Sequence, residues 1–289
     1  MTTTRQAFDQ FLENITATDY QKTSIIDARK NTVVANLQTA FPESSDLPFH
    51  QAHLMGSAAK KTITRPIDDV DVLAVFSDEK GAWLSKYRYD SQAFIYRIRQ
   101  AYDGLAVAQV GTRGQAVRVM FRTGGHVDVA PVFIQSGDVY YLPNGSGGWL
   151  TTAPTVANAW FNERNADRGG HLAPLVRLLK KWNRAHSKRF RSYHLETVAA
   201  NTFSSLGSNH RENLKRFFVW GQGHLDVHDP GRQSGSLADY LTWTARTDLK
   251  SSMQSAADRA EKAIAAEAAG NHADAKRLWK IILGSDFPA

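Results

Sequence analysis

Cysteine is absent from the sequence of 289 residues. Without thiols the chain cannot form disulfide bonds or metal sites built on thiolate ligands. Long apolar runs are also lacking, since no stretch approaches the roughly 18 uninterrupted apolar residues that a membrane-spanning helix needs. The first residues contain no apolar segment of the kind found in secretion signals. We therefore expect a soluble protein of the cytoplasm that has no membrane partner.

Internal repeats and low-complexity segments are not visible either. The hydrophobic fraction of 42% is that of an ordinary globular protein. A chain of this length can bury a sizeable core, either in one large domain or in two lobes.

Positive charge is concentrated in one stretch of the chain, whose net charge is +7. The segment from Leu172 to Ser192 has no carboxylate and contains seven cations, namely Arg177, Lys180, Lys181, Arg184, Lys188, Arg189 and Arg191. Such a stretch can face triphosphates or a polynucleotide, or it can be the solvated face of a helix. We expect one or two of these cations to meet phosphate and the others to lie in solvent. A nucleic-acid partner is compatible with this charge but is not required.

Hydrophobic periodicity predicts a mixture of helices and strands. Helices are expected over residues 5–14, 18–41, 86–102, 155–164, 171–186, 192–206, 210–221, 234–244 and 248–281. Gly270 and Asn271 are expected to break the last of these into two. Strands are expected over residues 50–55, 69–77, 105–111, 115–122, 126–134 and 138–142. Several connections are too short for crossovers, so some strands should be antiparallel.

The order of these elements divides the chain into two parts. Residues 143–154 are rich in Gly and Pro and are expected to form a loop between lobes. The fold class is therefore α/β (α+β), with a catalytic sheet lobe over residues 1–150 that includes the N-terminal helices. The second part is a helical lobe over residues 151–289. Ligand sites commonly occupy the cleft between two such lobes.

Two aspartates interrupt an apolar strand in the segment IDDVDVLAVF. Residues i and i+2 of a strand point to the same face, so Asp69 and Asp71 should project side by side while Val70 and Val72 pack behind them. Paired carboxylates repel each other unless a cation joins them. Mg²⁺ is the natural cation, because it binds carboxylate oxygens and completes its octahedron with water and substrate phosphates.

A third carboxylate, Asp128, stands between Val127 and Val129 in the segment GHVDVAPVF. Aspartate is disfavoured within strands, so its presence here indicates a function. On a neighbouring strand Asp128 would complete the metal site and take the proton from an attacking ribose hydroxyl. His126 shares its face and can assist, although such a histidine is more often structural.

A phosphate-binding element precedes the acidic pair in the segment HLMGSAAKKT. Gly56 allows the backbone to approach a ligand closely, and the N–H groups and hydroxyl of Ser57 can hold phosphate oxygens. A Gly-Ser pair alone means little. Followed thirteen residues later by a strand-borne Asp-x-Asp, it indicates a nucleoside triphosphate site.

The segment GSAAKKTITRPIDDVDVLAVF resembles the signature of the polymerase-β-like nucleotidyltransferase superfamily, which reads Gly-Ser, a short connection and Asp-x-Asp. With Thr62, Arg65 and Pro66 between the two halves, it is similar to the bacterial CD-NTases. These are cyclic oligonucleotide synthases related to cyclic-GMP-AMP synthase and to oligoadenylate synthase. The likeness continues through LVRLLKKWNRAHSKRFRSYHLE and HDPGRQSGSLADYL to AKRLWKIILGSDFPA, in the expected order.

The resemblance implies a polymerase-β-like sheet lobe plus a helical lobe, with the active site in the cleft between them. It implies that Asp69, Asp71 and Asp128 are catalytic and bind two Mg²⁺ ions, with Mn²⁺ as a possible substitute. It further implies that Lys180 grips a triphosphate together with Gly56, Ser57 and Ser192, and Ser192 is also expected to cap its helix. His194 and Glu196 are interpreted as packing and capping groups.

The activity implied is the joining of nucleoside triphosphates, such as ATP and GTP, into a cyclic di- or trinucleotide second messenger, with release of pyrophosphate. The resemblance places this activity in bacterial antiphage signalling, beside regulatory or effector proteins encoded nearby. A linear nucleotidyltransferase of the oligoadenylate or RNA-tailing type is the alternative enzyme. A non-catalytic nucleic-acid-binding protein is the third hypothesis, and three intact carboxylates argue against it.

Several aromatic and polar residues are candidates for base recognition. Tyr141, Trp149 and Trp160 could stack on bases, although each is more often a core or rim aromatic. Arg232 and Gln233 could contact base edges. The choice of bases, the linkage, the ring size and the activating signal do not follow from the sequence.

Overall fold

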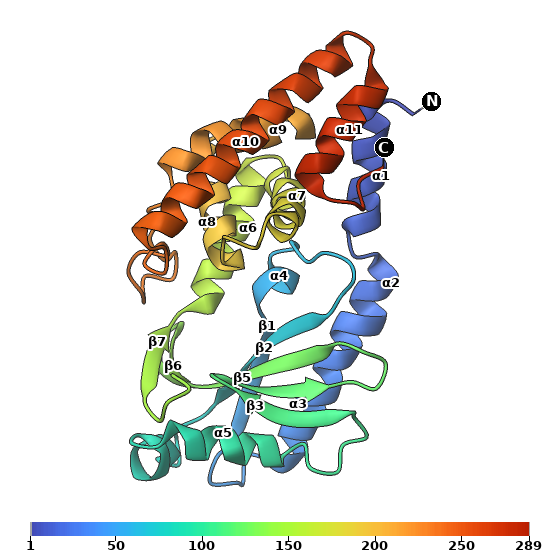
Figure 1. Cartoon of the computed structure of the whole chain (residues 1–289). Coiled ribbons are helices and arrows are strands. Elements are labelled where there is room, and N and C mark those ends of the chain that lie inside the picture. The colour runs from blue at the N-terminus through green and yellow to red at the C-terminus, as the bar shows by residue number, and fades with distance from the viewer. Residues whose placement is uncertain (1, 289) are drawn as a thin grey trace. The chain divides into compact units, whose positions relative to one another are not determined.

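The computed structural model describes residues 2–288, which form two compact units. One unit contains residues 17–158 and carries the sheet. The other contains the residues up to Thr16 together with those from Ala159 onward, and it is helical. Figure 1 shows the elements of both units.

The sheet unit is built on seven strands in a mixed sheet. In chain order these are β1 (Phe49–Leu54), β2 (Asp69–Phe76), β3 (Gln109–Arg113), β4 (Ala116–Met120), β5 (His126–Ser136), β6 (Val139–Pro143) and β7 (Trp149–Thr152). The main path of the sheet is β1-β2-β5-β4-β3, and β6 joins β5 to β7. β5 is parallel to β2 and antiparallel to β4 and β6, so it is the strand around which the sheet is organised.

The helices of the sheet unit are α2 (Asp19–Gln21), α3 (Ala28–Ala40), α4 (Gly56–Ala59) and α5 (Ser91–Gln100), with π-helical turns over Lys22–Asp27 and Trp83–Tyr87. The side chain of Asp90 caps α5 by accepting a hydrogen bond from the backbone N–H of Ala93 at 3.0 Å. This cap fixes where α5 begins.

The two faces of the sheet have different partners. On one face Val70, Val72, Val127 and Val129 pack in a core that also contains Val33 of α3 and the α5 residues Phe94, Ile95 and Ile98. The other face carries a smaller apolar cluster of Met55, Leu73, Val75, Val132 and Tyr140. The alternation of strand side chains therefore directs the aspartates of β2 and β5 away from the main core.

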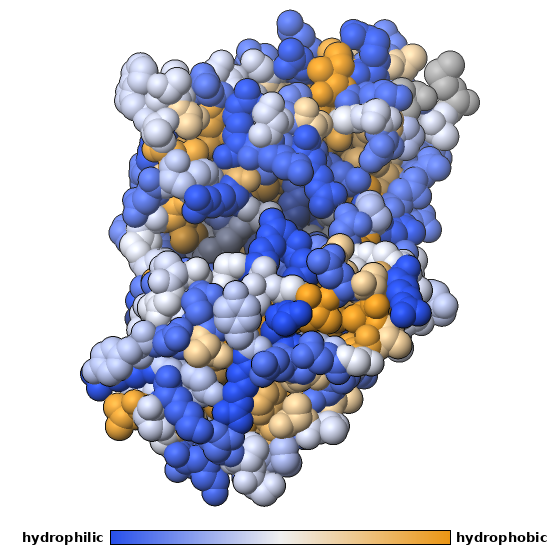
Figure 2. Space-filling view, turned by 60° about the horizontal axis from the view of Figure 1, so that its bottom comes forward, coloured by the Kyte–Doolittle hydropathy of each residue, from blue (hydrophilic) through white to orange (hydrophobic). Residues whose placement is uncertain are grey.

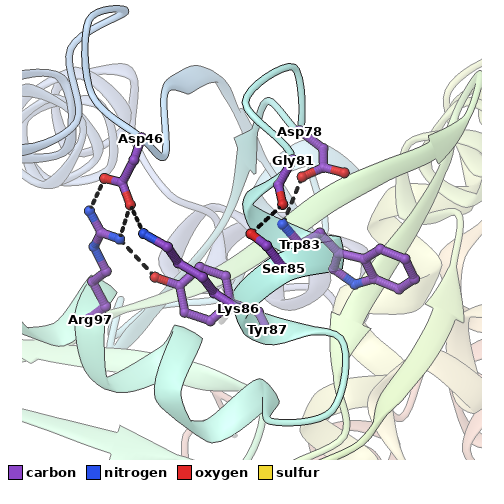
Figure 3. Close-up of polar contacts among 8 residues, drawn as sticks. All are labelled: Asp46, Asp78, Gly81, Trp83, Ser85, Lys86, Tyr87 and Arg97. Carbon is purple, nitrogen blue, oxygen red and sulfur yellow. Dashed lines mark hydrogen bonds and ion pairs between the residues drawn. The ribbon is translucent and has the colours of Figure 1, made fainter.

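An ion-pair cluster joins the π-helical turn at Trp83–Tyr87 to α5 (Figure 3). The carboxylate of Asp46 accepts hydrogen bonds from the ammonium of Lys86 at 2.6 Å and from both terminal nitrogens of Arg97. Arg97 also donates to the hydroxyl of Tyr87 at 2.8 Å. These bonds, those from Arg97 first, hold the pKa of Asp46 well below its usual value.

The helical unit contains α1 (Thr4–Ile15), most of α6 (Pro154–Asp167), α7 (Leu172–Ala185), α8 (Ser192–Thr202), α9 (His210–Trp220), α10 (Trp243–Ala268) and α11 (His272–Leu283). Its core includes Leu175, Val176 and Leu179 of α7. Of the cations in this helix, Arg177, Lys180 and Lys181 are half-buried and Arg184 is exposed. Asn271 caps α11 by accepting a hydrogen bond from the backbone N–H of Asp274 at 3.1 Å. The predicted break at Gly270 and Asn271 is therefore found between α10 and α11.

Three expectations about the division into lobes differ from the structure. The first helix was expected with the sheet, but Phe8 is fully buried at 5.0 Å, ring to ring, from both Trp279 and Phe287 of the helical unit. The predicted interlobe loop contains β7, which pairs with β6, and the boundary between units lies at residues 158 and 159, inside α6.

The helix expected over residues 234–244 is wrong. This segment is a series of turns, because the carboxylate of Asp229 accepts hydrogen bonds from the backbone N–H groups of Gly231, Gln233 and Ser234. These hydrogen bonds hold residues 231–234 in turns, and α10 begins only at Trp243, after its N-cap Thr242.

Within residues 2–288, no helix combines the length and the apolar character that crossing a bilayer requires. On the face shown in Figure 2, hydrophilic residues predominate and apolar residues form small separate patches. Isolated apolar side chains of this kind are normal on globular proteins.

The first prediction concerns acid stability. Because folding lowers the pKa of Asp46, its ion pairs should stabilise the fold above the unfolded-state pKa of about 3.9 and be lost as the pH falls below it. Asp46→Asn should reduce the free energy of unfolding at pH 7 by at most about 1 kcal/mol, since solvent screens the half-exposed carboxylate.

Urea unfolding at several pH values measures this effect. The difference between wild type and Asp46→Asn should shrink between about pH 4 and pH 2. A difference that stays constant through this range would contradict the assignment. Arg97→Met, which removes the main partner, should show the same pH dependence.

Candidate active site

The three predicted carboxylates emerge from neighbouring parallel strands. Asp69 and Asp71 lie at the start of β2, and Asp128 lies near the start of β5. In the pairing of these strands, Asp71 stands opposite Asp128 and Asp69 stands opposite His126. Neighbouring strands are about 4.8 Å apart, so the carboxylates of Asp71 and Asp128 leave the same face of the sheet side by side.

Burial along β2 follows the predicted alternation. Val70 and Val72 are each 1% exposed, whereas Asp71 is half-buried and Asp69 is exposed. The two valines hold the strand on the core, and the two acids therefore reach a surface where ligands can approach.

Gly56 lies directly against Asp71. The N–H of Met55 donates to the carbonyl of Asp71 at 2.8 Å, and this bond fixes the chain before α4 beside the acidic strand. A Cβ atom added to Gly56 would stand 2.2 Å from Oδ2 of Asp71, and Gly56 has a φ of +59°. A side chain at this position would have to displace the carboxylate of Asp71, and the left-handed backbone also favours glycine.

Ser57 follows Gly56 in the first turn of α4. Its carbonyl accepts hydrogen bonds from the N–H groups of Thr62 at 2.9 Å and Ile63 at 3.1 Å, which closes the loop that leads toward β2. The predicted phosphate-binding pair and the acidic pair are therefore held together by backbone hydrogen bonds within the sheet unit.

Arg118 is a site residue that the sequence interpretation missed. It lies on β4 opposite Asp128, and its Nε and Nη2 donate to the two carboxylate oxygens at 2.7 Å and 2.6 Å. These bonds, with smaller contributions from the charges of Asp69 and Asp71, raise the pKa of Arg118 above its usual value. An arginine between Val117 and Val119 on a predicted strand was the available signal, because it shares the alternation that was used for the aspartates.

A pocket of about 690 Å³ opens at these residues within the sheet unit. Its charged and polar lining residues are Asp69, Asp71, Arg113, Gln115, Arg118, Asp128 and Asn144. His126 lies beside it, with Nε2 at 3.7 Å from Oδ2 of Asp128. The pocket thus places three carboxylates and two guanidinium groups around one space, an arrangement suited to a polyanion with its cations.

The donor set fits a hard divalent cation, although residues 2–288 contain no group of three His, Asp or Glu side chains already assembled around one point. Carboxylate oxygens are the ligands that Mg²⁺ prefers, and Asp69, Asp71 and Asp128 line the same pocket. Arg118 donates to both carboxylate oxygens of Asp128.

The predicted triphosphate ligands Lys180 and Ser192 both belong to the helical unit. The ammonium of Lys180 forms an ion pair with the carboxylate of Glu196 at 2.7 Å, and the two side chains are 12% and 3% exposed. Glu196 is therefore the partner of Lys180, and the capping role expected for it is wrong. The N-cap of α8 is Arg191, so the capping role of Ser192 is wrong as well, and Ser192 lies exposed in the first turn.

Other residues near the start of α8 have structural roles. His194 is buried between the backbone carbonyl of Leu225, at 2.8 Å from Nε2, and the hydroxyl of Tyr240, at 3.0 Å from Nδ1. Burial lowers its pKa. This agrees with the packing role that the sequence indicated.

Asp229 organises the loop that contains Arg232 and Gln233, and the hydroxyl of Tyr193 donates to it at 2.6 Å. Burial acts to raise the pKa of Asp229, but these hydrogen bonds outweigh it and the pKa is lowered. Arg232 is exposed and has a φ of +56°.

Two candidate stacking residues are part of the sheet unit's own packing. Tyr141 stacks on Trp83 with ring centroids 4.7 Å apart, and the indole N–H of Trp149 donates to the carbonyl of Tyr87 at 3.0 Å. Trp160, in the helical unit, lies under the guanidinium of Arg164 at 4.1 Å. Other groups of the protein thus already contact these three rings, which agrees with the interpretation of them as core or rim aromatics.

Residues 1–165 match the family of Second Messenger Oligonucleotide or Dinucleotide Synthetase domains. The match covers more than half of the chain and includes Gly56, Asp69, Asp71, Arg118 and Asp128. The chain belongs to this family. It is therefore a nucleotidyltransferase, and the resemblance to CD-NTases is confirmed.

Relatives of the synthetase family span nearly the whole chain. A probable cyclic nucleotide synthase of Bacillus cereus is 25% identical, covering 99% of this chain and 98% of the relative. A cyclic AMP-AMP-AMP synthase of Acinetobacter is 24% identical over 96% of this chain and 84% of its own length. The solved structure of Escherichia coli CdnC with ATP has a TM-score of 0.81 and 20% identity, covering 98% of both chains. That likeness confirms the predicted fold class.

The second prediction tests the close contact of Gly56 with Asp71. Gly56→Ala should displace the carboxylate of Asp71 and lower kcat by more than about 100-fold, because metal and phosphate groups must be held in register. It should also cost about 1–2 kcal/mol through the left-handed backbone.

Gly137→Ala is the matched control for this variant. Gly137 has a φ of +53° and nothing within 4 Å of an added Cβ, so its substitution carries the backbone cost without the contact. It should destabilise the protein similarly and retain activity. Equal losses of activity in the two variants, by steady-state kinetics and thermal melting, would contradict the importance of the contact.

The third prediction concerns the pair of Lys180 and Glu196. Lys180→Met should lower the free energy of unfolding by about 3–5 kcal/mol, since Glu196 loses this partner at a buried position. Adding Glu196→Gln should restore most of the loss, which a double-mutant cycle by urea unfolding measures.

Lys181→Met is the control for the neighbouring cation. Its partner Asp286 is 68% exposed, so the change should cost less than about 1 kcal/mol. Equal costs for Lys180→Met and Lys181→Met would contradict the buried ion pair.

Proposed function

We propose that the protein is a metal-dependent synthase that joins nucleoside triphosphates into a cyclic di- or trinucleotide. The observation that carries the proposal is the alignment of Asp71 with Asp128 on adjacent parallel strands, with Asp69 and Gly56 beside them. The names of the Bacillus and Acinetobacter relatives, a cyclic nucleotide synthase and a cyclic AMP-AMP-AMP synthase, support it. A role in bacterial antiphage signalling agrees with the relative named CBASS oligonucleotide cyclase CdnC from Escherichia coli.

The residues of the sheet unit define one part of the donor site. Asp69 and Asp71 would hold two Mg²⁺ ions, or Mn²⁺, together with Asp128. The N–H groups and hydroxyl of Ser57 would bind phosphate oxygens next to Gly56, whose missing side chain lets the ligand approach. Lys180 and Ser192 are assigned to the triphosphate by the family resemblance alone and remain a prediction.

The proposed reaction is an attack of a ribose hydroxyl on the α-phosphorus of a donor nucleotide. Bound divalent ions would stabilise the charge that develops on the phosphate and on the leaving pyrophosphate. Asp128 would accept the proton from the attacking hydroxyl, and Asp69 and Asp71 would keep the donor in line with it. A second round on the linear product would close the ring.

Protein partners belong to the same proposal. A structure of Escherichia coli CdnC in complex with HORMA-deltaN has a TM-score of 0.78 to this chain. It supports a regulatory protein partner for this synthase as well.

The fourth prediction tests the activity and its catalytic residues. Purified protein incubated with four labelled nucleoside triphosphates and Mg²⁺ or Mn²⁺ should yield a phosphatase-resistant product, whose mass identifies the ring. Asp69→Asn, Asp71→Asn and Asp128→Asn should each reduce the product by more than about 100-fold.

Asp68→Asn is the matched control, since Asp68 precedes Asp69 on the opposite parity of the strand. It should retain synthesis. Ladders or acceptor-dependent labelling would instead indicate the linear transferase. If no product forms with either Mg²⁺ or Mn²⁺, the nucleic-acid-binding hypothesis is favoured.

A further inference from the structure

Arg118 and Asp128 form a bidentate ion pair in the candidate site. Two hydrogen bonds of 2.7 Å and 2.6 Å join the guanidinium to the two carboxylate oxygens in a fork-to-fork arrangement. The backbones of β4 and β5 already place these residues opposite each other. The side chains are 20% and 21% exposed, so the pair lies at the wall of the pocket and not in the core.

This contact conflicts with the role proposed for Asp128. A carboxylate that ligates a divalent ion or accepts a proton must present an oxygen to it, and both oxygens of Asp128 face Arg118. A divalent ion on Asp128 would also place two positive groups within a few ångström of each other, which is unfavourable. Either the ion or the guanidinium can hold this carboxylate closely, but not both in the present geometry.

The charge of the site explains why the arginine is there. Asp69, Asp71 and Asp128 bring three carboxylates together, and like charges this close disfavour each other. Arg118 interacts with all of them, most strongly with Asp128. It therefore supplies the positive charge that the acidic site needs whenever cations are absent.

We propose that Arg118 is a positioning residue that exchanges partners. It holds and neutralises Asp128 while the site is free of divalent ions, and it moves to a phosphate of the nucleotide when an ion takes Asp128. This inference rests on the metal site of the proposed function and goes beyond it by naming the residue that competes for the third ligand.

Arginine is well suited to such an exchange. Its planar fork matches a phosphate as well as a carboxylate, and its charge does not depend on pH near neutrality. Arg118 lines the same pocket as Asp69 and Asp71, so a phosphate bound in this pocket would lie near its guanidinium group. The exchange requires only rotation of a long side chain and leaves the pairing of β4 with β5 unchanged.

The fifth prediction is a titration with Mn²⁺ alone, by electron paramagnetic resonance or calorimetry, with no nucleotide present. Arg118→Gln removes the competitor for Asp128 and should bind Mn²⁺ about tenfold tighter than wild type, the size of one hydrogen bond to a charged group. Arg118→Lys keeps the charge but loses the fork, so it should lie between the two.

Two control variants isolate the contact from general charge. Arg113→Gln removes a positive charge from the same pocket without touching Asp128, and it should change the Mn²⁺ affinity by less than about threefold. In an Asp128→Asn background, Arg118→Gln should give no further gain, because the competition is gone.

Nucleotide kinetics test the second part of the proposal, in which Arg118 binds a phosphate of the nucleotide. Arg118→Gln should raise the KM for nucleoside triphosphate about tenfold or more, since the released arginine no longer meets a phosphate. A simple structural pair would lower stability and leave both the Mn²⁺ affinity and the KM unchanged. Either an unchanged or a weaker Mn²⁺ affinity in a folded Arg118→Gln protein, checked by thermal melting, would overturn the proposal.

The outcome separates this inference from the proposed function. If Mn²⁺ binds wild type and Asp69→Asn equally, the metal site itself is wrong. If Asp69→Asn abolishes binding while Arg118→Gln changes nothing, the metal site stands and only the partner exchange fails.

Discussion

The parallel pairing of β2 with β5 is the constraint on which the site depends. In this register Asp71 stands beside Asp128, while Val70 and Val72 of the same strand are buried with Val127 and Val129. A slip of one residue would bury the acids and expose the valines, which would be costly on both faces. The apolar core of the sheet unit therefore fixes the geometry of the charged groups that lie on its other side.

The face on which these aspartates lie could be predicted from the sequence, because the alternation of side chains along a strand is a local rule. Asp71 and Asp128 each lie between two valines and Asp69 precedes Val70, and the burial of these valines follows directly from the alternation. Five of the seven strands were predicted within about two residues of their bounds, whereas β3 was predicted about four residues too early and β7 was missed. The break near Gly270 was predicted because glycine and asparagine end and begin helices. Local chemistry was sufficient for these elements.

Tertiary contacts decided what the sequence interpretation missed. Phe8 joins the helical unit because Trp279 and Phe287, more than 260 residues away in the chain, complete its surroundings. Glu196 is the partner of Lys180, and Arg118 is the partner of Asp128, through side chains brought together by different helices or strands. Neither pairing has a fixed spacing in sequence, so no local pattern could have indicated it.

The bond between Tyr193 and Asp229 has a consequence for the helical unit. Tyr193 follows Ser192 directly in the first turn of α8, and Asp229 shapes the turn that displays Arg232. The carboxylate of Asp229 thus bonds both to the first turn of α8 and to the backbone of its own loop. This bond therefore ties the start of α8 to the loop that follows Asp229, although 36 residues separate Tyr193 from Asp229 in the chain.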